Sequence, residues 1–288
     1  SLDFLFEGKT NPQFGEKIAV FLAGIIDHFP WLSDYHFQIE SRNSFPHSTG
    51  IASSASAMSV LAMCLCSIEN ELTGNLSNHE EFLNKASYIA RLGSGSASRS
   101  VYPDAAIWGK LDSVPGSSDE FAIPLPYDLH GKYHNYQDSI LIVSSETKKT
   151  SSRAGHKLME GNPYAQVRYK QATRNLETLN ETLQNGDLEQ FGKIVESEAL
   201  TLHALMMCSE PSFILMKPNT LVLIDKIRAF REETKQPVYF TLDAGPNIHL
   251  LYPASAKQKV TTFIESDLKP FCERILYDEM GPGPIQIA

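Results

Sequence analysis

The chain has 288 residues, a formal net charge of −9 and 42% hydrophobic residues, a composition typical of a globular protein. This length is enough for one large domain or two modest ones, each with its own core. The acidic balance, with no basic stripe, argues against a nucleic-acid partner, although a small phosphorylated ligand can bind wherever positive groups are concentrated. No uncharged apolar run approaches the ~18–20 residues that span a bilayer, so we expect no membrane partner.

The N-terminal part of the sequence carries helical and strand patterns in mixed order. Apolar residues at helical spacing between 15 and 28 predict a first helix, and the alternating residues 36–40 (HFQIE) predict a strand. Four further elements are predicted in this part: a turn at 43–50, an apolar helix from Ser53, a helix at 80–91 and a short strand at 105–109.

A stretch rich in Pro, Gly and Ser, residues 113–131, is the best candidate for a domain boundary. We therefore predict an N-terminal domain at 1–135 and a C-terminal domain at 136–288. The second domain is expected to hold strands at 139–145, 238–242 and 248–252 and helices at 163–184, 188–207, 219–234 and 254–267. Strands and helices that do not strictly alternate indicate the α+β class.

The four cysteines, Cys64, Cys66, Cys208 and Cys272, form neither a CxxC pair nor a Cys/His cluster at metal-binding spacing. We expect buried free thiols in a reducing cytoplasm, and no metal ion held by protein ligands. The sequence does not begin with Met, so we expect the natural N-terminus to lie outside it.

Residues 43–57, NSFPHSTGIASSASA, place Gly50 before a helix that starts near Ser53 and Ser54. The free N–H groups and the positive dipole end of such a helix form a phosphate cradle. A helix with ordinary serine caps is the alternative interpretation.

Residues 91–100, RLGSGSASRS, surround Arg99 with small residues and hydroxyls. The guanidinium fork suits a carboxylate or phosphate, and Ser94, Ser96 and Ser98 can donate hydrogen bonds around it. A flexible loop with a solvated arginine remains the alternative.

Two segments of the C-terminal half carry further chemistry. In 241–247, TLDAGPN, Asp243 follows a buried strand at a rigid turn, where it acts as a general base or bonds its own backbone as a turn-former. In 147–155, TKKTSSRAG, positive charge lies beside two hydroxyls, which indicates an anion contact or a solvated loop.

In their order, these four segments resemble those of the GHMP kinase superfamily and, within it, the diphosphomevalonate decarboxylase family. NSFPHSTGIASSASA is similar to that family's phosphate loop NNFPTAAGLASSAAG, although His47 departs from it. RLGSGSASRS is similar to RxGSGSACRS, with Ser98 in place of Cys. YFTLDAGPN resembles YTFDAGPN, TKKTSSRAG resembles KKxxSSxxGM, and the GPGP at 281–284 also fits.

The resemblance implies a GHMP kinase-like two-domain fold. Its N-terminal α+β half would bind the nucleotide, its C-terminal half would be ferredoxin-like, and the active site would lie between them. It also implies an ATP-dependent carbon–carbon lyase that uses Mg2+. ATP would phosphorylate the 3-hydroxyl of mevalonate 5-diphosphate, and loss of phosphate and CO2 would give isopentenyl diphosphate for the mevalonate pathway. A homodimer is implied as well.

The resemblance assigns roles to individual residues. Asp243 would orient or deprotonate the 3-hydroxyl, Arg99 would hold the departing carboxylate, and Ser96 would lie between the two ligands. The implied substrate contacts are Ser94, Arg99, Ser152 and Arg153. The implied contacts to ATP phosphates, with Mg2+, are Asn43, Gly50, Ile51, Ala52, Ser53 and Ser54. An unpaired buried Arg99 would be costly, which favours a substrate carboxylate as its partner.

Three alternatives and one departure remain open. His203, in SEALTLHALMM, matches a family position, but in this helix a hydrogen-bonded core histidine is the alternative interpretation, so we assign it no catalytic role. The family's opening segment, similar to NIALVKYWGK, has no counterpart here, so we expect a truncated chain with an open edge in its N-terminal sheet. A phosphomevalonate decarboxylase or mevalonate 3-kinase-type enzyme is one functional alternative. A non-catalytic sensor on the same scaffold is the other.

Overall fold

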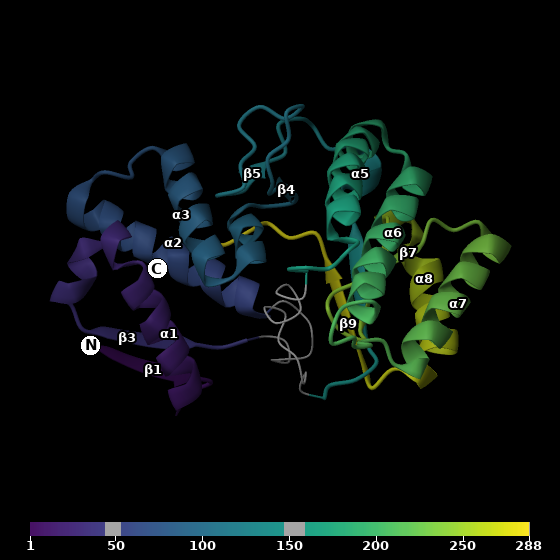
Figure 1. The fold of residues 1–288 in the computed structure, drawn as a ribbon, viewed down its shortest axis with the longest axis horizontal. Coiled ribbons are helices and arrows are strands. Elements are labelled where there is room, and N and C mark those ends of the chain that lie inside the picture. The colour runs from purple at the N-terminus through teal and green to yellow at the C-terminus, as the bar shows by residue number, and fades with distance from the viewer. Residues whose placement is uncertain (44–52, 147–158, 288) are drawn as a thin grey trace. The chain divides into compact units, whose positions relative to one another are not determined.

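The computed structural model describes residues 1–43, 53–146 and 159–287, and it divides the chain into two compact units (Figure 1). Of the described residues, 1–43, 53–124 and 282–287 form the first unit, and 125–146 and 159–281 form the second. The domain boundary between residues 135 and 136, inferred from the Pro-, Gly- and Ser-rich stretch of the sequence, stays a prediction.

The first unit contains a three-stranded sheet in the order β2-β1-β3. Strand β1 (Leu2–Phe6) pairs antiparallel with β2 (Lys9–Thr10) and parallel with β3 (Phe37–Ser41). Helix α1 (Pro12–Gly24) provides the crossover that a parallel pair requires, and the Asn11 side chain caps it by accepting from the Phe14 N–H at 3.1 Å. Among the described residues β3 pairs only with β1, so it is an edge strand.

Two long helices pack beside this sheet and form the core of the first unit. They are α2 (Ser53–Thr73) and α3 (His79–Gly93), which lie side by side in Figure 1. Asn78 caps α3 by accepting from two N–H groups of its first turn. The chain then forms a 3-10 helix, η3 (Gly95–Val101), where the sequence predicts a loop, and a short antiparallel pair of β4 (Ala106–Ile107) and β5 (Ile123–Pro124) follows.

The second unit is built on a four-stranded antiparallel sheet in the order β7-β8-β6-β9. Its strands are β6 (Gln137–Ile142), β7 (Tyr239–Leu242), β8 (Ile248–Tyr252) and β9 (Arg274–Glu279). Strand β6 is central, and its buried apolar run follows from burial on both faces. Together with the first unit, this mixture of helices with separate sheets confirms the α+β class.

In the described part of the second unit, four helices cover the sheet: α5 (Ala165–Asn185), α6 (Leu188–Met207), α7 (Pro218–Thr234) and α8 (Lys257–Phe263). Residues of α7 and α8 pack with Phe240 and Leu242 in the main core. Strand alternation turns Tyr239 to the opposite face, where it packs with Phe191 of α6. A Cβ on Gly192 would lie 2.0 Å from the Tyr239 ring, so α6 contacts β7 more closely than any other residue at this position would permit.

The cysteines only partly match the expectation of buried free thiols. All four are free, but Cys64 and Cys208 are exposed and Cys272 is half-buried, which corrects the prediction for these three. Burial raises the pKa of the Cys66 thiol to about 12, so this thiol stays protonated and unreactive at neutral pH. No helix in the described part of the chain is long and apolar enough to cross a membrane.

Candidate functional site

The serine-rich segment 91–100 is packed against an aromatic ring. A Cβ on Gly95 would lie 2.9 Å from the Trp108 ring, so only glycine allows η3 to approach this side chain. The Arg99 guanidinium carbon lies over the same ring, 5.8 Å from its centroid. Arg99 is exposed, so the expected cost of burying its charge does not arise. The segment is therefore an ordered 3-10 turn that presents an arginine, which contradicts the flexible-linker interpretation.

Ser98 does not belong to the ligand-facing hydroxyls that the sequence suggested. Its side chain is fully buried and donates to the Gly95 carbonyl at 2.9 Å. The Ser87 hydroxyl donates to the Ser98 carbonyl at 2.8 Å and accepts from the Ala122 N–H at 2.8 Å. Ser98 thus stabilises the turn from within, whereas Ser94 and Ser96 remain half-buried at the surface of the unit.

The structure brings the first and second predicted motifs together. Ser54, in the first turn of α2, and Ser94, at the end of α3, have their hydroxyl oxygens 3.2 Å apart. Ser53 begins α2, where main-chain N–H groups lack helical acceptors and attract anions. Asn43 lies near β1, and its N–H donates to the Glu7 carboxylate at 2.9 Å. Gly50, Ile51 and Ala52 lie outside the described residues.

Asp243 lies directly after β7, with its side chain exposed. Its main-chain carbonyl accepts two hydrogen bonds, from the Gly245 N–H at 2.7 Å and from the His203 ring Nε2 at 3.0 Å. Within the described chain, no residue donates a hydrogen bond to the Asp243 carboxylate, so main-chain contacts form the turn and the carboxylate stays available. The turn-former interpretation of Asp243 is therefore not supported.

Two more buried side chains hold the same turn. Thr220, at the start of α7, donates from its hydroxyl to the Pro246 carbonyl at 2.7 Å. The Asn247 side-chain oxygen accepts from the Val143 N–H at 2.8 Å and the Ser144 N–H at 3.1 Å. Thr220 and Asn247 are almost fully buried, so water cannot reach their polar atoms and these hydrogen bonds within the protein satisfy them. The turn that carries Asp243 is thus held by side chains of two helices, α6 and α7, and by its own Asn247, which binds the main chain after β6.

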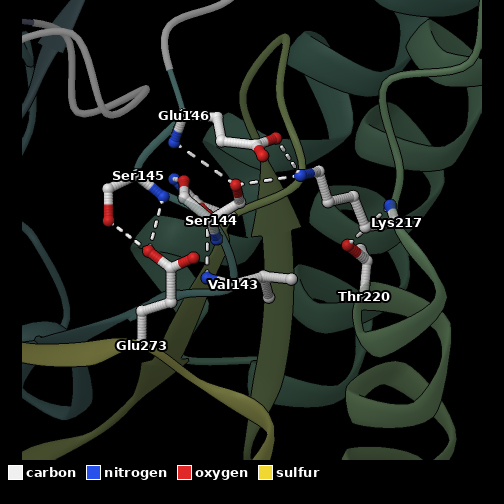
Figure 2. A network of polar contacts seen from close by, with 8 residues as sticks. Val143, Ser144, Ser145, Glu146, Lys217, Thr220 and Glu273 are labelled. Carbon is white, nitrogen blue, oxygen red and sulfur yellow. Dashed lines mark hydrogen bonds and ion pairs between the residues drawn. The ribbon is translucent and has the colours of Figure 1, made fainter.

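The end of β6 is fixed from two further directions (Figure 2). The Lys217 ammonium donates to the Ser144 hydroxyl at 3.0 Å and pairs with the Glu146 carboxylate. The Glu273 carboxylate accepts from the Ser145 N–H at 2.8 Å and from the Ser145 hydroxyl, and these bonds hold the pKa of Glu273 below its ordinary value. This stretch leads toward Ser152 and Arg153, which lie outside the described residues.

A half-buried histidine lies on β8 beside this turn. His249 is paired in register with Thr241, and its Nδ1 lies 2.8 Å from an Asp138 carboxylate oxygen. Burial by itself would lower the pKa of His249, but the hydrogen bond that its Nδ1–H donates to the Asp138 carboxylate and the charges of Asp138, Asp243 and Asp278 together raise it. No local pattern in the sequence predicts this contact, because its partners lie on separate strands, β6 and β8.

Two family models match the chain in succession. The diphosphomevalonate decarboxylase-like N-terminal domain matches residues 3–121, and the mevalonate 5-diphosphate decarboxylase C-terminal domain matches residues 139–284. The chain belongs to the diphosphomevalonate decarboxylase family. The assignment agrees with the resemblance carried by the four motifs, and it places the Asp243 turn in the C-terminal domain of the family.

Similar proteins and solved structures agree with this family assignment. A diphosphomevalonate decarboxylase from Ganoderma lucidum is 30% identical over 84% of this chain and 59% of its own length, so the chain spans about three fifths of that relative. The mevalonate diphosphate decarboxylase from Staphylococcus aureus superposes with a TM-score of 0.82 at 27% identity, over 98% of this chain and 81% of that one. A complex of MDDEF with MVAPP, AMPPCP and magnesium has a TM-score of 0.81 at 28% identity, over 98% and 82%. The predicted GHMP kinase-like fold is confirmed.

Proposed function

We propose that the chain catalyses the ATP-dependent decarboxylation of mevalonate 5-diphosphate to isopentenyl diphosphate, with release of ADP, phosphate and CO2. The observation that carries the proposal is the exposed Asp243 carboxylate on a turn held by buried hydrogen bonds, in a chain that belongs to the diphosphomevalonate decarboxylase family. A carboxylate presented in this way is suited to direct or accept a proton.

Asp243 is assigned to the 3-hydroxyl of the substrate. It orients this hydroxyl or takes its proton while the hydroxyl oxygen forms a bond to the γ-phosphorus of ATP and the bond to the ADP oxygen breaks. The phosphorylated oxygen then leaves as inorganic phosphate. The bond between the carboxylate carbon and the adjacent carbon breaks as well. Its electron pair forms the new C=C bond, and the carboxylate departs as CO2.

Arg99 is assigned to the carboxylate that leaves as CO2. Its fork matches a carboxylate, and the Trp108 ring behind it limits the directions in which the guanidinium can point. Ser94 and Ser96 donate from the same 3-10 turn. We assign Ser152 and Arg153 to the substrate carboxylate and diphosphate on the basis of the family motif alone.

The start of α2 is assigned to the phosphates of ATP. Ser53 and Ser54 lie in its first turn, where N–H groups and hydroxyls can donate to phosphate oxygens, and this part of the chain therefore fits the nucleotide. By family match, Asn43, Gly50, Ile51 and Ala52 complete the contacts. Among the described residues no group of three or more His, Cys, Asp or Glu could hold a metal ion. We therefore assign Mg2+ to the phosphate oxygens, whose charge it neutralises when bound.

We propose two further properties that the family membership favours. The first is a homodimer, which light scattering of the purified protein measures directly. The second is a cytoplasmic location, which is supported by four free cysteines because disulfides are rare in reducing compartments.

The test is to measure ADP, phosphate and CO2 together, with Mg-ATP and mevalonate 5-diphosphate. We expect equal amounts of the three products, and their loss in Asp243→Asn but not in the control Asp225→Asn, which changes an exposed aspartate of α7. ADP without CO2 would indicate a 3-kinase, and activity only with the monophosphate would indicate a phosphomevalonate decarboxylase. Substrate binding with no turnover would indicate a sensor.

A further inference from the structure

The carbonyl of Asp243 is the point at which the helix α6 contacts the turn. His203 lies on the last part of α6, is 2% exposed, and has its Nε2 3.0 Å from this oxygen. A carbonyl oxygen only accepts hydrogen bonds, so Nε2 carries the proton and donates it. This contact selects one of the two neutral tautomers of the imidazole.

A histidine in this place requires an explanation, because packing alone would favour an apolar side chain. Burying an imidazole without a partner costs free energy that a leucine or methionine would not cost. The neighbours Leu205 and Met206 are both buried and apolar. The property that distinguishes His203 from them is a hydrogen-bond donor that reaches across to the turn after β7.

The hydrogen bond acts on the direction of the Asp243 side chain. The carbonyl of Asp243 lies in the peptide plane that joins it to Ala244, so holding this oxygen fixes the backbone rotation next to the Asp243 Cα. The Gly245 N–H bonds the same oxygen and closes a three-residue turn. Rotating this peptide plane would break both hydrogen bonds at once. It would leave the buried His203 Nε2–H without its acceptor.

The helix that holds His203 is itself held against the strand that holds Asp243. Gly192, eleven residues earlier in α6, allows the helix to contact the Tyr239 ring at the start of β7. The helix and the strand therefore touch at one end through this close approach and at the other end through the His203 hydrogen bond. A fixed distance between the two elements makes the hydrogen bond a geometric constraint on the turn.

We propose that His203 is a positioning residue for Asp243: its Nε2–H, donated to the Asp243 carbonyl, sets the direction in which the Asp243 carboxylate points. The inference rests on the proposed function, in which Asp243 acts on the substrate hydroxyl. His203 contacts neither substrate nor nucleotide in this proposal, and its only assigned action is through the main chain of Asp243.

The test compares His203→Leu with His203→Gln, because glutamine places an N–H donor at a similar reach. We expect His203→Leu to lower kcat by about tenfold to a hundredfold, the loss that a small misplacement of a catalytic group produces. The KM for ATP should stay unchanged, since Asn43, Ser53 and Ser54, the described residues assigned to the nucleotide, lie in the first unit. His203→Gln should recover most of kcat. Thermal unfolding of both variants gives the folded fraction by which kcat is corrected.

Three results would overturn the inference. One is an unchanged kcat in His203→Leu, and another is an equal loss in both variants after correction for the folded fraction. The third comes from the unaltered protein and covers the case in which neither variant folds: a nitrogen NMR spectrum that places the His203 proton on Nδ1. The wild-type assay separates the two proposals. No turnover with any of the substrates would remove the proposed function as well, whereas normal turnover that is indifferent to His203 would remove only this inference.

Discussion

Replacing Asn247 tests whether the Asp243 turn depends on its buried amide. Asn247→Leu keeps a side chain of similar shape and removes the hydrogen bonds to Val143 and Ser144. Two buried N–H groups then lose their acceptor, at a cost of about 1–3 kcal/mol each, which gives a loss of about 2–6 kcal/mol. This is a large part of the ~5–15 kcal/mol that stabilises a typical domain.

The assay is urea unfolding followed by far-UV circular dichroism. We expect the midpoint to fall while the slope with denaturant stays the same, since the surface exposed on unfolding does not change. Asn75→Leu is the matched control, because Asn75 is exposed at the end of α2 and its substitution should cost less than about 0.5 kcal/mol. A loss below about 1 kcal/mol in Asn247→Leu would refute the reasoning, because it would show that the two N–H groups find other acceptors.

Three further predictions concern packing, pH and substrate binding. Gly192→Ala places a methyl group 2.0 Å from the Tyr239 ring, so we expect a lower melting temperature and a loss of about 1–3 kcal/mol; an unchanged melting temperature would contradict the packing. The pKa of His249 is raised in the folded state, so protonated His249 stabilises the fold. This stabilisation is complete when the pH is below the ordinary pKa of histidine, and it is lost as the pH rises through the pKa of His249 in the folded state. Urea titrations at several pH values should show this loss, and Asp138→Asn should remove it. Arg99→Met should raise the KM for the substrate at least about tenfold, the loss of one charge-assisted pair, with the KM for ATP unchanged.

The sequence predicted elements best where one face is buried and the signals at both ends are clear. Helix α6 has the predicted bounds because Asp187 caps its start by accepting from the Gln190 N–H, and an apolar stripe continues to its end. Strand β8 also matches the prediction. Strand β9 was missed because it is the edge of its sheet and four of its six residues are exposed, so it lacks a regular apolar pattern.

The candidate site was harder to predict because its contacts join residues that are distant in the sequence. Ser96 and Ser98 are both serines and lie only two positions apart, yet the fold buries Ser98 against Ser87 and leaves Ser96 near the surface. Nothing local distinguishes them. The role of His203 likewise depends on the turn that begins forty residues later, and a histidine inside an apolar helix was the only signal that the sequence offered.

The hydrogen bonds that hold the Asp243 turn also bear on the order of events during folding. Their partners are separated by 40 residues for His203, by 26 for Thr220 and by 104 for the bond from Val143 to Asn247. Contacts between such distant parts of a chain form after local helices, because each one closes a long loop. In a refolding experiment, helical signal should therefore return first. The carboxylate of Asp243 would acquire its fixed direction only when the last of these segments has docked.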